Sequence, residues 1–292
     1  MIRTLSIATS IVVAGATGAS ASSIGDRAAP ASPPAVQVAA SFLAANLTGA
    51  NEVPPADPDG TGAAVLRVRG TELCFSLRWN AIGTPTAAHL HGGPAGVNGP
   101  VLAAFFTVAL PASLRAVVGC VTVEPGLAQA LVAAPANFYV NVHNAQHPGG
   151  AIRAQLGPTR PTDLLNLLRG PLVAVADGSQ EVPDGADPDG HGVAFVRGQA
   201  MTITFAVNYG RITPPTAAHI HTGVFGVNGP VAVGFFSAPG GLPANFTAVS
   251  GVVNAAAPLV AQINSQPGNY YVNLHTADFP GGAIRGQLFR AG

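Results

Sequence analysis

The chain contains the same unit of about 120 residues twice, and this duplication constrains its fold more than any other feature. Equivalent motifs are separated by 129 residues at Glu52 and Glu181, and by 132 residues at His143 and His275. Because this separation changes little along the unit, few insertions distinguish the two copies. One tandem duplication predicts two similar domains, whereas a solenoid needs a longer series of repeats.

Each unit is a series of short, alternating apolar segments separated by Gly, Pro and Asn. In the first unit, the candidate strands are residues 40–47, 63–69, 72–79, 86–90, 101–106, 116–123, 137–143 and 151–156. A short helix is expected across residues 127–132, with its counterpart near 258–263. This pattern predicts an all-β protein with two tandem Greek-key β-sandwich or barrel domains of about eight antiparallel strands each.

The ends of the units follow from composition. Residues 1–21 have a positive charge near their start, at Arg3. An apolar run follows and leads to Ala19-Ser20-Ala21, as in a secretory signal peptide. We expect an Ala-, Ser- and Pro-rich spacer at 22–37, domains at 38–157 and 170–292, and a linker at 158–169. The protein is then secreted or periplasmic, with no membrane span after signal cleavage, because the apolar run is too short.

Charge and composition exclude several classes of function. The formal net charge is zero, 9% of residues are charged, and the sequence contains no lysine. A nucleic-acid partner is excluded because the chain has no basic surface pattern. Schiff-base chemistry and a Walker-type phosphate loop are excluded because both need lysine.

A His-x-His motif occurs in each unit, at His89 and His91 and at His219 and His221. Alternate side chains of a strand share a face and lie roughly 6.5 Å apart along the backbone. Two such imidazoles can reach one metal ion, because metal–nitrogen bonds are about 2 Å long.

A third histidine lies on a later strand of each unit, at His143 and His275. Alternation places it on the face opposite the core, together with the pair and with Arg153 or Arg285. We therefore predict one three-histidine metal site per unit, and a hydrogen-bonded scaffold that holds a loop is the alternative.

Three further groups of residues leave alternatives open. His147 is either an extra ligand of the first site or a loop residue, since Phe279 occupies the equivalent position. The two arginines either guide an anion or pair with Glu52 and Glu181. Cys74 and Cys120, whose counterparts are near Thr204 and Gly251, are expected to form a disulfide, and metal ligation is the alternative.

The order of the motifs resembles the CHRD domain, which is named after chordin, a secreted antagonist of growth factors. The motifs are Glu52-Val53-Pro54, Ala88-His89-Leu90-His91, Asn98-Gly99-Pro100-Val101, Tyr139 to His143 and Pro148 to Arg153, and all recur in the second unit. Asp184 replaces the second Pro there, and the second unit lacks cysteines. The resemblance implies an exported protein and covers nearly all of the chain after the signal peptide.

A second resemblance is to copper–zinc superoxide dismutases, which are Greek-key barrels with a His-x-His strand, a later strand histidine and an Arg. His89, His91, His143 and Arg153 match that order, as do His219, His221, His275 and Arg285. The zinc-binding residues of those enzymes have no counterpart, so this resemblance implies a copper centre of three histidines in each unit.

These observations predict an exported metal-binding protein whose metal is copper, with zinc as the alternative. A copper-dependent oxidoreductase of the superoxide dismutase type is the second hypothesis. A metal-free module that binds an extracellular or periplasmic protein partner is the third.

Overall fold

The structure is a computed structural model that describes residues 39–161, 170–183 and 186–291. The predicted signal peptide and spacer lie outside the described residues, and so does residue 38, the first residue of the predicted first domain. Most of the predicted linker also lies outside them. Among the described residues, no helix is long and apolar enough to cross a membrane.

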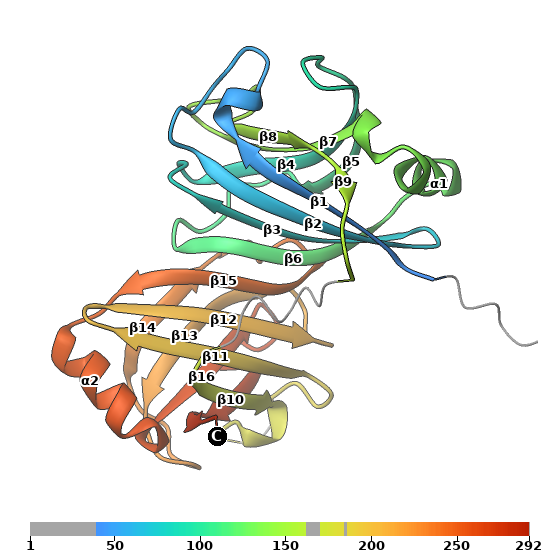
Figure 1. The fold of residues 1–292 in the computed structure, drawn as a ribbon. Coiled ribbons are helices and arrows are strands. Elements are labelled where there is room, and N and C mark those ends of the chain that lie inside the picture. The colour runs from blue at the N-terminus through green and yellow to red at the C-terminus, as the bar shows by residue number, and fades with distance from the viewer. Residues whose placement is uncertain (1–38, 162–169, 184–185, 292) are drawn as a thin grey trace, which may run out of the picture. The chain divides into compact units, whose positions relative to one another are not determined.

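The first unit forms antiparallel strands where alternation predicts them (Figure 1). They are β1 Ser41–Thr48, β2 Thr61–Arg69, β3 Glu72–Asn80, β4 Pro85–Gly92, β5 Val101–Phe106, β6 Leu114–Thr122, β7 Phe138–Asn144, β8 Ile152–Gln155 and β9 Gly157–Pro158. The helix α1, Pro125–Ala133, confirms the helical segment expected there. Neighbouring strands pair in the order β6–β3–β2–β1–β8–β7–β4–β5, and β9 pairs with β1.

The second unit repeats this arrangement. Its elements are β10 Leu172–Asp177, β11 His191–Gln199, β12 Thr202–Gly210, β13 Pro215–Thr222, β14 Val231–Ser237, β15 Phe246–Asn254, α2 Ala257–Ser265, β16 Tyr270–Thr276, β17 Ile284–Gln287 and β18 Phe289–Arg290. Short 3-10 turns occupy Gly49–Asn51, Pro135–Asn137, Gly178–Gln180 and Pro267–Asn269. The strand order is β15–β12–β11–β10–β17–β16–β13–β14, which confirms the predicted all-β fold.

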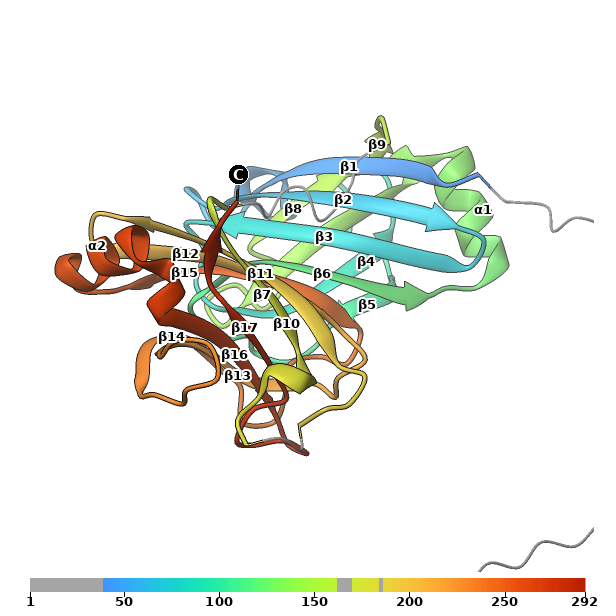
Figure 2. The ribbon, with the colours of Figure 1, turned by 90° about the horizontal axis from the view of Figure 1, so that it is seen from below.

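The core of each unit is built from the strand faces that alternation assigned to it. Leu90, Val140, Val142 and Ile152 are buried on the inner face of β4, β7 and β8, which lie side by side (Figure 2). Aromatic rings from opposite strands complete the core, and the Phe75–Phe105 pair is an example with ring centroids 4.4 Å apart. The apolar period of two therefore decides which face of each strand packs inward.

Strand β6 also pairs with β15 of the second unit, which the sequence did not predict. Val117 lies opposite Val249 and Val118 lies opposite Ala248 in an antiparallel ladder. The backbone N–H of Cys120 donates to Asn245 O at 3.1 Å. Each of these two edge strands thus hydrogen-bonds backbone groups of the other that would otherwise be unpaired.

Candidate metal centre

Three histidines meet on the side of β4 and β7 that faces away from the core. His89 and His91 come from β4 and His143 comes from β7. One ring nitrogen of each lies within 4.8 Å of the others. The ring centroids of His89 and His91 are 5.6 Å apart, and those of His89 and His143 are 4.9 Å apart.

The second unit forms the same cluster from His219, His221 and His275. The corresponding centroid separations are 5.6 Å and 4.9 Å. The structure therefore brings both predicted triads together, each within reach of a single ion.

The strand register explains why three residues on two strands converge. His89 pairs with Asn141, and His143 pairs with Ala87, so His143 is a diagonal neighbour of His89. The register of β4 with β5 shifts at Ala88/His89 and again at Leu90/His91. Such bulges bend a strand and turn its side chains, which here gathers the imidazoles of His89 and His91.

Backbone carbonyls hold two rings of each triad in one tautomer. His91 Nδ1 lies 2.9 Å from Gly99 O, and His143 Nδ1 lies 3.0 Å from Pro148 O. His221 and His275 make the same bonds to Gly229 O and Pro280 O. Because a carbonyl only accepts, Nδ1 carries the proton, and Nε2 of each ring keeps a lone pair that can accept a hydrogen bond or bind a metal ion.

Three ring nitrogens of the second triad have no hydrogen-bond partner. His219 Nδ1, His221 Nε2 and His275 Nε2 are all buried and lack a hydrogen-bond partner. Buried nitrogens without a partner are costly, and a shared cation would satisfy all three. In the first triad, His89 Nδ1 lies 3.0 Å from His143 Nε2, and His91 Nε2 has no partner.

Burial keeps two rings of each triad uncharged. It lowers the pKa of His89 and of His219 to about 4, and the neighbouring rings of each triad lower it further. Burial also lowers the pKa of His143 and of His275. These four imidazoles are therefore neutral at pH 7, which is the form that binds a metal ion.

An aromatic stack supports one ring of each triad. The His91 ring stacks on Tyr139 with centroids 4.7 Å apart and planes 9° apart. The guanidinium carbon of Arg153 lies 3.4 Å from the centre of the same tyrosine ring. His221, Tyr271 and Arg285 repeat this stack.

Arg153 also fastens the loop that supplies the carbonyl partner of His91. Its guanidinium donates to Val97 O at 2.6 Å and to Asn98 Oδ1 at 2.9 Å. The loop backbone at Gly99 N donates to Tyr139 Oη at 3.1 Å. The arginine therefore orients His91 indirectly, through the loop. Residues that contact the ligands of a metal site commonly act in this way.

The two arginines do not lie exposed as anion guides, and they act on Glu52 and Glu181 electrostatically without a direct ion pair. Arg153 and Arg285 are each 1% exposed, and their guanidinium groups bind loop carbonyls and asparagine side chains, so they are not anion guides. Among the ion pairs of the described residues, none joins Arg153 to Glu52 or Arg285 to Glu181. The face that alternation predicted to point outward is covered by loops, which create a second, polar interior.

The remaining candidates are placed as follows. His147 lies outside the triad, with Nε2 3.9 Å from Asp57 Oδ2, so it is a loop residue and not an extra ligand. Cys74 and Cys120 form the predicted disulfide, so their sulfur atoms are not free to bind a metal.

Glu52 and Glu181 are buried, although the sequence suggested them only as partners of the two arginines. Burial raises the pKa of each carboxyl to about 7, although the nearby arginine lowers it. Glu181 Oε2 accepts from Asn273 Nδ2 at 3.2 Å, whereas Glu181 Oε1 and Asn273 Oδ1 lack partners. The recurrence of Glu-Val-Pro in both units was the available signal.

A Glu181→Gln variant should show this protonation as a pH-dependent gain in stability. The carboxyl titrates at about 7 when folded and near 4.5 when unfolded, so the wild type loses stability as the pH rises through that window. The variant lacks this loss. Its free energy of unfolding in urea should gain up to about 3 kcal/mol relative to wild type between pH 5 and pH 8. A difference that does not change with pH would contradict a protonated carboxyl.

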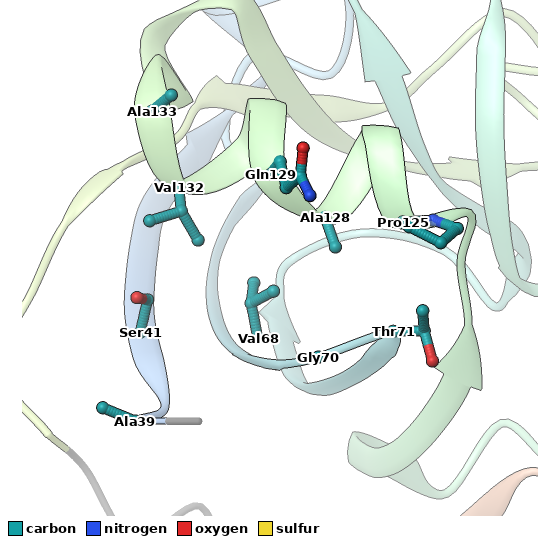
Figure 3. A pocket seen from close by; sticks show the side chains of 10 residues that line it. All are labelled: Ala39, Ser41, Val68, Gly70, Thr71, Pro125, Ala128, Gln129, Val132 and Ala133. Carbon is teal, nitrogen blue, oxygen red and sulfur yellow. The ribbon is translucent and has the colours of Figure 1, made fainter. Parts of the chain in front are cut away.

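A hollow of about 510 Å³ lies between α1 and the ends of β1 and β2 (Figure 3). Val68, Ala128 and Val132 give it an apolar lining, and Gln129 and Ser41 are polar groups at its wall. None of its lining residues is titratable, so it offers no chemistry comparable to that of the histidine clusters.

Comparison with known proteins identifies a family for both units. The CHRD domain model matches residues 43–156 and residues 172–288. No curated protein and no solved structure shows significant similarity to the chain. The resemblance to copper–zinc superoxide dismutases thus receives no support from these comparisons.

Proposed function

We propose that this chain, which belongs to the CHRD-domain family, binds one copper ion in each of its two units through three histidines. The observation that carries this proposal is the convergence of ring nitrogens without hydrogen-bond partners, at His219, His221 and His275. Two of these rings are fixed by carbonyls in the tautomer that leaves Nε2 free. A metal-free scaffold would gain nothing from this arrangement.

The donor set favours copper among the common metals. Imidazole nitrogen suits copper, zinc, iron and nickel, and divalent copper binds a given nitrogen site more tightly than the others do. Three histidine ligands leave room for further ligands, so zinc remains the competing metal in the test. If copper is bound, it would supply one-electron chemistry, and superoxide dismutation by the loaded protein is a separate assay.

We also propose that the protein acts outside the cytoplasm, in a secreted or periplasmic location. The Cys74–Cys120 disulfide supports this, because such bonds persist in oxidising compartments. The signal-peptide pattern at residues 1–21 agrees.

Copper titration of the purified protein, followed by electron paramagnetic resonance, tests the proposal. We expect saturation at two equivalents of copper(II), with a nitrogen-rich tetragonal spectrum. A parallel titration with zinc should show weaker binding at the same sites. Uptake without a defined stoichiometry, removable by a weak chelator, would contradict the proposal and favour a metal-free interaction module.

A further inference from the structure

We propose that the Cys74–Cys120 disulfide is a site of thiol–disulfide exchange, at which a dithiol reductant attacks Cys120 and Cys74 leaves beside Arg67. This function does not depend on metal binding by the histidines. It rests on the placement of the two sulfur atoms, on one cation and on a comparison between the two units.

The two sulfur atoms differ in their surroundings. Cys74 on β3 is buried, whereas Cys120 on β6 is partly exposed. The two residues lie directly opposite each other in the β3–β6 ladder. An incoming thiolate therefore reaches the sulfur of Cys120 more easily, which makes Cys74 the leaving group.

A guanidinium is held against the sulfur that would leave. Arg67 Nη2 lies 3.2 Å from Cys74 Sγ and 2.9 Å from Glu72 Oε2. Arg67 and Cys74 are also register partners on β2 and β3, so the strands themselves place the contact. A cation beside a cysteine stabilises its thiolate, and a thiol of lower pKa leaves faster in exchange.

The disulfide lies outside the main core of its unit. Cys74 packs with Val118, Ala248 and the partly buried Val65 in a small separate cluster. The β3–β6 ladder extends from Glu72 to Arg78 on β3, so backbone pairing continues on both sides of the bond. Opening the disulfide should therefore leave the core and the ladder in place.

The second unit shows that the fold does not need this bond. Phe205 pairs with Gly251 there, as Phe75 pairs with Gly119 in the first unit. The equivalents of the two cysteines are therefore Thr204 and Val252, which corrects the Gly251 expected from sequence. Because the same strands form without the disulfide, its retention in the first unit calls for a chemical role.

The exchange is balanced in atoms and electrons. One thiolate of the dithiol bonds to Cys120 Sγ, the Cys74–Cys120 bond breaks, and its electron pair goes to Cys74 Sγ. The second thiolate of the same dithiol then bonds to the first sulfur of that dithiol. The mixed disulfide to Cys120 breaks, and Cys120 leaves as a thiolate. The dithiol is oxidised by two electrons, the cysteine pair is reduced by two, and the two thiol protons move to the cysteines.

The kinetic test measures opening of the disulfide in the full chain by dithiothreitol at pH 7, with alkylation of freed thiols and mass spectrometry. Arg67→Gln should slow the opening about three- to tenfold, because Cys74 loses its cation. Arg197→Gln is the matched control, since Arg197 faces Thr204 at the equivalent position of the second unit. Equal rates for the wild type and both variants would overturn the proposal.

Two further readouts test the direction of attack and the structural alternative. Reduced glutathione, trapped as a mixed disulfide, should be found on Cys120, and its recovery on Cys74 would overturn the assignment. The reduced wild-type protein should keep its near-ultraviolet circular dichroism and a cooperative thermal transition. Unfolding on reduction would show a structural bond and would also overturn the proposal.

Discussion

Replacing both His89 and His91 by alanine should reduce copper binding from two equivalents to one. The variant removes two of the three donors of the first triad, and the affinity of that site should fall more than about 100-fold, because even residues around a metal site cost up to that much. Isothermal titration calorimetry, with the resonance spectrum of the remaining ion, provides the measurement. The triad of the second unit serves as an internal control for folding.

The matched control for this variant is the double substitution His147→Ala and His191→Ala. It removes the same number of imidazoles, but neither residue belongs to a triad. It should keep two equivalents and an unchanged spectrum. Loss of an equivalent in the control, or two equivalents retained in the triad variant, would contradict the assignment of ligands.

Replacing Arg153 by methionine should cause a large loss of stability in the first unit. Methionine keeps part of the packing against Tyr139, but Val97 O and Asn98 Oδ1 lose their donors. The donor is a buried cation, and a hydrogen bond made by a charged group contributes about 1.5–3 kcal/mol. We expect the free energy of unfolding to fall by about 3–4 kcal/mol in urea denaturation.

The same variant should weaken copper at the first site about 10- to 100-fold, because the loop that holds His91 through Gly99 O is released. Arg78→Met is the control, since Arg78 is exposed on β3 and its loss should cost less than about 0.5 kcal/mol. A loss below about 1 kcal/mol for Arg153→Met would show that the loop is held by other contacts.

The strands and their inner faces could be predicted because the signal is local. Leu90 and Val142 alternate with polar residues over a few positions, and a period of two requires no knowledge of distant neighbours. The duplication added a comparison within one chain, which identified the triads among eight histidines. His147 and His191 could be separated from the others because they do not recur.

The surroundings of the triads could not be predicted, because they depend on contacts between segments far apart in the chain. Arg153 contacts a loop 55–59 residues away, and Glu181 contacts Asn273 at a separation of 92 residues. Alternation reports that these side chains leave the core, but it does not report what covers them. The sequence therefore left open whether the arginines guide an anion or pair with Glu52 and Glu181.

The sequence alone determined that the chain is a duplicated antiparallel β protein, which side chains face each core, and which six histidines share the opposite face. The tertiary structure decided that loops cover this face, that two imidazoles of each triad present Nε2, and that β6 joins β15. The physical reason is that strand periodicity follows from neighbouring residues. Burial and hydrogen-bond partners follow from which loops and edges meet in space.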